Sequence, residues 1–66
     1  MSDELLTTAE VGQMLKVAVT TLRQWRARHL GPPGFAVGGT VRYRKSAVER
    51  WLAEQEQAAA GGRVSA

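Results

Sequence analysis

Seven cationic side chains and no acidic one lie between Glu10 and Glu49, and five of the seven are arginines. The guanidinium group is planar, and its fork of donors matches both phosphate oxygens and the base edge of guanine. The acidic residues are confined to the two ends of the chain, so the middle concentrates positive charge. This pattern predicts a polyanionic partner. The alternative is a solvated basic face without a partner.

The residue types that catalysis or metal binding requires do not cluster in this sequence. The chain has no cysteine and a single histidine, His29, which we expect at a helix end or the surface. Ser46 is better explained as a helix cap than as a nucleophile. The pair Gly38-Gly39 is not followed by the Lys and Ser/Thr of a phosphate-binding loop. We therefore expect no enzyme activity, no metal and no cofactor.

A first helix is predicted over about residues 8–16. Thr7 and Glu10 have the spacing of a capping box. The apolar side chains that follow recur at the helical spacing i, i+3, i+4 and form one face: Val11, Met14 and Leu15. Leu5 and Leu6 are expected to staple the start of this helix onto the core.

A second helix is predicted over about residues 19–29, after a short connection, with Leu22 and Trp25 facing inward. Gly31 is expected to end it, because two prolines follow. Two short helices joined in this way form a helix-turn-helix, whose second helix enters the DNA major groove. The candidate DNA-binding residues on this helix are Thr20, Thr21, Arg23, Gln24, Arg26 and Arg28.

These side chains are expected to divide between base reading and phosphate binding. Arginine can bind guanine and glutamine can bind adenine through two hydrogen bonds, so Arg23 and Gln24 are the expected base readers. The others are expected to hold phosphate, which positions the protein without specifying sequence. Taken alone, the pattern also fits an ordinary exposed helix.

A β-hairpin is predicted from residues 35–37 and 41–44. A two-residue Gly38-Gly39 turn would pair Phe35 with Arg42. A three-residue loop would instead pair Phe35 with Tyr43 and Val37 with Val41. We expect the three-residue loop, because it gathers the apolar side chains on one face. Positive charge on the other face and a narrow tip predict further DNA contacts: Gly39, Thr40, Arg42, Arg44 and Lys45.

A third helix is predicted over about residues 47–58, with Ser46 and Glu49 as a second capping box. Trp25 and Trp51 could stack on bases, but so short a chain needs their bulk in its core. We expect one domain over residues 1–60 and a disordered tail over 61–66. The fold class is mainly α with a small β-hairpin: a winged helix-turn-helix with three helices and a two-stranded wing.

Four segments in order carry a resemblance to a known family: Leu5 to Val11, Thr21 to Arg26, Val37 to Ser46, and Val48 to Leu52. They resemble the phage excisionases, small relatives of the MerR-type winged-helix DNA-binding domain. The resemblance covers about residues 5–54. It departs from the family at Lys16, where glycine is usual, and at Ala18, where serine or threonine usually caps the second helix.

The resemblance implies a recombination directionality factor. Such a protein binds double-stranded DNA at a phage attachment site, bends it, and helps a tyrosine integrase to excise the prophage. It implies that residues 20–28 lie in the major groove and that Gly39, Thr40 and Arg42 form the wing contact, with Arg44 and Lys45 on adjacent phosphate. It also implies that the protein acts in the cytoplasm of a bacterial host.

Two rival functions remain at this stage. A small phage transcriptional regulator could use the same surface, although the region after Leu52 shows no sustained heptad pattern for dimerisation. A protein-interaction adaptor would not bind DNA at all. We expect a monomer that loads cooperatively on DNA, with no membrane and no small-molecule substrate. The N-terminus does not resemble a signal peptide.

Overall fold

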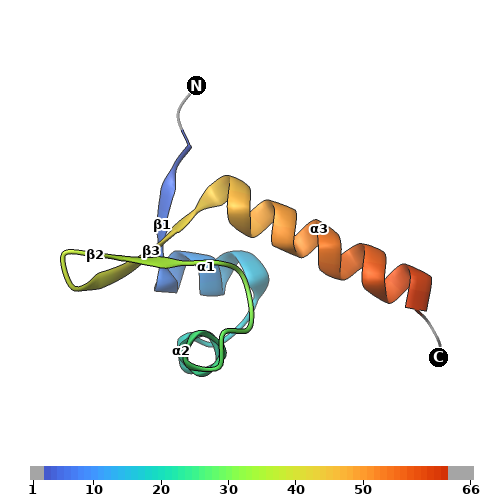
Figure 1. The fold of residues 1–66 in the computed structure, drawn as a ribbon, viewed down its shortest axis with the longest axis horizontal. Helices are drawn as coiled ribbons and strands as arrows, with labels where there is room; N and C mark the ends of the chain where they lie inside the picture. The colour runs from blue at the N-terminus through green and yellow to red at the C-terminus, as the bar shows by residue number, and fades with distance from the viewer. Residues whose placement is uncertain (1–2, 63–66) are drawn as a thin grey trace.

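The computed structural model describes residues 3–62. Figure 1 shows a β-hairpin extending to the left, α2 seen end-on at the bottom and α3 running to the right. The fold is a winged helix-turn-helix with three helices and an antiparallel hairpin, which confirms the predicted fold class. The elements in chain order are β1 (Leu5–Thr7), α1 (Thr8–Leu15), α2 (Val19–Ala27), β2 (Phe35–Val37), β3 (Thr40–Arg44) and α3 (Lys45–Gly62).

A third strand, which the sequence analysis did not predict, completes the sheet. β1 pairs antiparallel with β3, so the strand order is β1-β3-β2. Leu6 lies opposite Tyr43 in this pairing and is buried. The two leucines before α1 therefore act as an edge strand, and only Leu6 faces the core.

The hairpin shows that the predicted three-residue loop is wrong. The turn is Gly38-Gly39, and the cross-strand partners are Phe35 with Arg42, Ala36 with Val41, and Val37 with Thr40. Both glycines have positive φ angles, 56° and 85°. A two-residue hairpin turn requires this backbone, and glycine adopts it without a steric penalty.

The observed register changes which side chains share a face of the sheet. Tyr43 is buried at 2% exposure, as predicted, but Phe35 lies on the opposite face with Arg42 and Arg44 and stays 37% exposed. The expected pairing of Phe35 with Tyr43 is therefore wrong. The register follows the Gly38-Gly39 turn, which places Ala36 rather than Phe35 on the face of β2 that Val41 and Tyr43 share.

Local signals account for the start of α1. The Glu10 backbone N–H donates to the Thr7 hydroxyl at 3.1 Å, and the Thr7 N–H donates to the Glu10 carboxylate at 2.8 Å. The predicted capping box is confirmed. The helix ends where Lys16 adopts a left-handed backbone with φ of 61°, and the Val17 N–H donates back to the Gly12 carbonyl at 2.8 Å.

α2 begins without a side-chain cap, because Ala18 occupies the N-cap position. The helix ends at Ala27, two residues before its expected end. His29 and Gly31 both adopt a left-handed backbone, with φ angles of 58° and 77°. The Leu30 N–H donates to the Trp25 carbonyl at 2.7 Å and the His29 N–H to that of Arg26 at 3.1 Å. This pair of hydrogen bonds is the Schellman helix ending.

The expected capping role of Ser46 is also wrong, because β3 passes directly into α3 and places Ser46 inside the helix. Asp3 takes that role from the other end of the chain. Its carboxylate accepts hydrogen bonds from the Ser46 backbone N–H at 3.1 Å and from the Ser46 hydroxyl at 2.7 Å. α3 continues to Gly62, beyond the expected end near Ala58, and residues 63–66 of the predicted tail lie outside the described residues.

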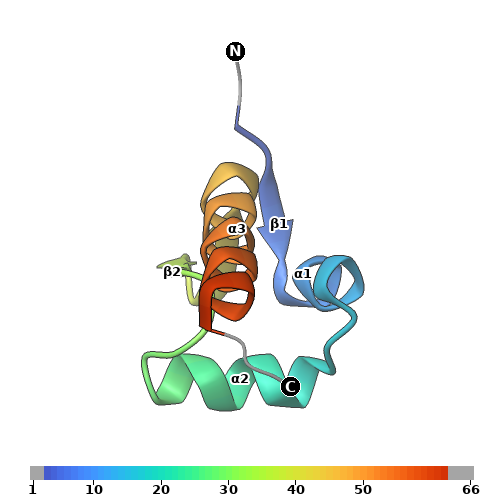
Figure 2. The same cartoon turned by 90° about the vertical axis from the view of Figure 1, so that its right-hand side faces the viewer.

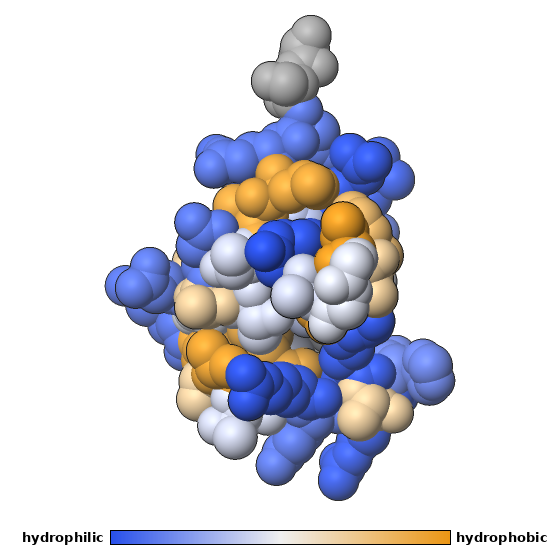
Figure 3. Space-filling view, turned by 90° about the vertical axis from the view of Figure 1, so that its left-hand side faces the viewer, coloured by the Kyte–Doolittle hydropathy of each residue, from blue (hydrophilic) through white to orange (hydrophobic). Residues whose placement is uncertain are grey.

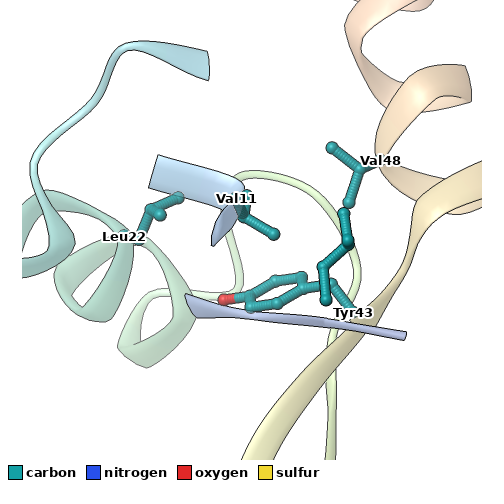
Figure 4. Packing of buried hydrophobic residues seen from close by; sticks show 5 residues of the cluster. Val11, Leu22, Tyr43 and Val48 are labelled. Carbon is teal, nitrogen blue, oxygen red and sulfur yellow. The ribbon is translucent and has the colours of Figure 1, made fainter. Parts of the chain in front are cut away.

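One small apolar cluster joins the elements (Figure 4). Its buried members come from β1, from β3 and from all three helices: Leu6, Val11, Leu22, Tyr43 and Val48. Trp25 packs against this cluster, and its ring centroid lies 5.9 Å from that of Trp51 on α3. An aromatic pair of this kind contributes about 0.5–1.5 kcal/mol beyond its buried area. The predicted core role is confirmed for Trp25, whereas Trp51 is half-buried and packs on Trp25.

Candidate nucleic-acid interface

α2 lies at one edge of the molecule with one side open to solvent. In Figures 1 and 2, two views at right angles, it forms the bottom of the domain, and no other described element lies beneath it. Leu22 anchors the helix from above because its side chain is buried in the core. The exposed side of α2 is therefore available to a partner along its whole length.

A groove of about 410 Å³ separates α2 from the hairpin. Three arginines line it, Arg23 and Arg26 from α2 and Arg42 from β3. The hairpin tip adds Gly39 and Thr40 to the same groove. The two cationic elements thus converge on one side of the domain, as the sequence analysis requires for a common polyanionic partner.

The groove is electrostatically one-sided. Its lining in the described part of the chain contains three guanidinium groups and no carboxylate. The Arg42 guanidinium donates a hydrogen bond to the Val41 carbonyl at 2.9 Å, which holds its side chain along β3. The Thr40 hydroxyl donates to the Val37 carbonyl at 2.9 Å across the turn. Clustered like charges in a groove attract anions strongly.

The remaining predicted residues of α2 lie on its other sides. Thr20, Gln24 and Arg28 are exposed, and Thr21 is half-buried. None of these four lines the groove. The structure therefore separates the predicted α2 residues into a group beside the hairpin and a group that faces away from it.

Arg44 and Lys45 are not brought into the groove. The Arg44 guanidinium lies 3.8 Å from the Asp3 carboxylate and 5.7 Å from the centre of the Phe35 ring. The Lys45 ammonium lies 4.0 Å from the Glu4 carboxylate. The acidic N-terminal segment thus places a carboxylate beside each of these two cations, at the end of β3 and the start of α3.

Sequence reasoning did not include six residues that line the groove: Thr7, Thr8, Ala9, Val19, Val41 and Tyr43. The first two border it because β1 pairs with β3 and leads directly into α1. The sequence signal for this position was absent, since the pairing of β1 was not foreseen. The Thr8 hydroxyl adds a further hydrogen-bonding group for an anionic partner.

The surface agrees with this arrangement. Figure 3 looks onto the hairpin end of the domain and shows hydrophilic side chains projecting at the bottom, at the level of α2, with smaller apolar patches above them. Among residues 3–62, no helix is both long and apolar enough to cross a lipid bilayer. The same residues hold no group of three acidic or histidine side chains that could bind a metal.

Fold and groove together define a winged helix-turn-helix domain with a basic helix and a basic hairpin on one side. A family model described as a helix-turn-helix domain matches residues 5–56, so the chain belongs to this family of DNA-binding domains. No match emerges from comparison with curated proteins. Comparison with solved structures yields none either.

Proposed function

We propose that this protein is an excisionase: a sequence-specific DNA-binding protein that bends attachment-site DNA and promotes excision of a prophage by a tyrosine integrase. The observation that carries the proposal is the shared groove, because it brings Arg23, Arg26 and Arg42 to one side of a helix-turn-helix domain. The similarity of four sequence segments to excisionases supports the specific role.

The mechanism is architectural and needs no chemical step. α2 inserts into the major groove, and the hairpin contacts the sugar-phosphate backbone beside it. Neutralising phosphates on one side of the duplex favours bending toward the protein, and the bend brings integrase sites together. α3 stays clear of the DNA. From Ala53 to Ala60 its residues are exposed, and they offer a surface for integrase or a neighbouring copy on the DNA.

The test is a recombination assay with the attachment sites and integrase of the source phage. We expect the protein to stimulate excision and not integration. Arg42→Gln should abolish the stimulation, whereas Arg50→Gln should preserve it, because Arg50 is an exposed arginine of α3 outside the groove. The proposal fails if the wild-type protein leaves excision unchanged. Repression of a nearby promoter with unchanged recombination would instead identify a small phage transcriptional regulator.

A further inference from the structure

We propose that the groove between α2 and the hairpin seats one strand of the DNA backbone, so that Arg23 and Arg26 hold phosphate and Gln24 reads the base. The inference rests on the proposed DNA binding and assigns the roles within that interface. It reverses the expected role of Arg23, which the sequence analysis placed with Gln24 among the base readers.

The positions of the side chains around α2 separate Gln24 from the two arginines. Successive helical residues are rotated by about 100°. Arg23 and Arg26 are therefore rotated by about 100° and 40° from the buried Leu22, toward the hairpin. Gln24 is rotated by about 200° and points away from the core, into the open side of α2 that Figures 1 and 2 show.

The shape of the duplex places a sugar-phosphate backbone between α2 and the hairpin. A single backbone ridge separates the major groove from the next minor groove, and the major groove admits one helix. When α2 lies in the major groove and the hairpin tip reaches past it, that ridge must lie between them. The groove between α2 and the hairpin lies in that position and can receive it.

The lining of the groove is cationic on both its α2 side and its hairpin side, which suits the anionic oxygens of a phosphodiester. Three guanidinium groups and the hydroxyls of Thr8 and Thr40 line it, with no carboxylate among the described lining residues. Gly39 has no side chain at the tip, so the backbone of the hairpin can approach the sugar closely.

Gln24 has the matching chemistry for the bases. Its amide can accept from N6 and donate to N7 of adenine at once, which distinguishes an A·T pair in the major groove. Thr20 lies on the same exposed side, about 160° from Leu22, one helical turn before Gln24. Gln24 is therefore the specificity-determining residue, and Thr20 lies near it on the DNA-facing side.

The first experiment selects preferred duplexes from a randomised library for the wild-type protein and for three variants. Arg23→Ala should select the wild-type sequence with weaker binding, and its slope of log affinity against log salt should fall by about 0.9. Gln24→Ala should keep the slope and lose roughly tenfold discrimination at one A·T pair. Arg50→Ala, a matched arginine on α3, should change neither.

The second experiment addresses single atoms of the selected duplex. Replacing one phosphate by an uncharged methylphosphonate should weaken the wild-type protein and leave Arg23→Ala unaffected at that position. Replacing one adenine by 7-deazaadenine should weaken the wild-type protein and leave Gln24→Ala unaffected. Each pair of results identifies one contact.

The outcomes separate this inference from the proposed function. If Arg23→Ala alters the selected sequence, or Gln24→Ala preserves every base preference, the assignment of roles is overturned while DNA binding stands. If the wild-type protein binds no duplex at low salt, both the proposed function and this inference are wrong. All three substitutions are at exposed positions, and thermal melting verifies that each variant folds.

Discussion

Asp3 ties the N-terminal segment to the start of α3, 43 residues away along the chain. Its two hydrogen bonds from Ser46 lower the pKa of the carboxyl group below its usual value, and the nearby Arg44 guanidinium lowers the pKa further. A negative charge at a helix N-terminus is also favourable to the helix dipole. One acidic side chain thus caps a helix and balances a cation of β3.

Replacing Asp3 with an uncharged residue should make the stability of the fold less dependent on pH in the acidic range. Because folding lowers the pKa of Asp3, the contribution is present above the ordinary carboxyl pKa of about 3.9 and is lost as the pH falls through the lowered value. Asp3→Asn should therefore melt at a lower temperature than the wild type at neutral pH, and the difference should vanish in strong acid. A difference that persists unchanged in strong acid would contradict this account. Glu4→Gln is the control, since exposed ion pairs contribute little.

Arg44 and Lys45 should matter less for DNA than Arg42. Both are paired with acidic residues outside the groove, whereas Arg42 lines it. Arg44→Gln and Lys45→Gln should each change duplex affinity less than Arg42→Gln does, with a smaller change in the salt slope. Fluorescence anisotropy at several salt concentrations measures both quantities. Equal losses in the three variants would show that the DNA extends along the whole of β3.

Residue-level predictions succeeded where the signal was local. Thr7 and Glu10 cap α1 because both partners lie within one turn of each other. The role of Ser46 was not predictable in the same way, because its partner Asp3 comes from a distant segment. The pairing of β1 with β3 creates that proximity, and no short sequence pattern encodes it.

At the scale of elements, the weak points are the two helix boundaries inside the helix-turn-helix. Lys16 ends α1 in a left-handed backbone, which costs a non-glycine residue about 1–2 kcal/mol. Ala18 starts α2 without a side-chain acceptor for the free backbone N–H groups. The two positions at which the sequence departs from the excisionase pattern are therefore a strained helix end and an uncapped helix start.

Restoring the usual residues should stabilise the domain. Ala18→Ser supplies a cap acceptor and should add about 1 kcal/mol. Lys16→Gly relieves the left-handed strain, partly offset by the flexibility of glycine in the unfolded chain. In a domain this small, each 1 kcal/mol corresponds to roughly 4–8 °C in Tm. Lys16→Ala is the control, since it removes the charge and keeps the strain; stabilisation by Lys16→Ala would contradict the backbone explanation.

The hairpin shows why the register was predicted wrongly from the sequence. Burial favoured the pairing of Phe35 with Tyr43, and turn geometry favoured Gly38-Gly39 with two positive φ angles. The turn set the register, and it leaves Ala36 rather than Phe35 on the face of Tyr43. Leu6 lies beside Tyr43 on the other side of β3, and its strand could not be located from its own pattern of three residues.

At the scale of the whole molecule, the sequence predicted the fold class and the convergence of two basic elements. The order of the three helices and the two hairpin strands follows from apolar periodicity and turn residues, which is why it was predictable, whereas β1 was not predicted. The groove itself was not, because its depth depends on how β1 and the start of α1 border the hairpin. The assignment of phosphate and base contacts likewise needs the rotation of α2 about the anchor at Leu22.

The central claim is that α2 and the hairpin contact the same DNA molecule at the same time. Titrating the isotope-labelled protein with a short duplex, and following each backbone amide by NMR, tests it most directly. The amide resonances of α2 and of Gly38 to Arg42 should shift together and saturate at one ratio of DNA to protein. The amide resonances from Ala53 to Ala60 of α3 should not shift. Shifts confined to α2 alone, to the hairpin alone, or to α3 would contradict the account.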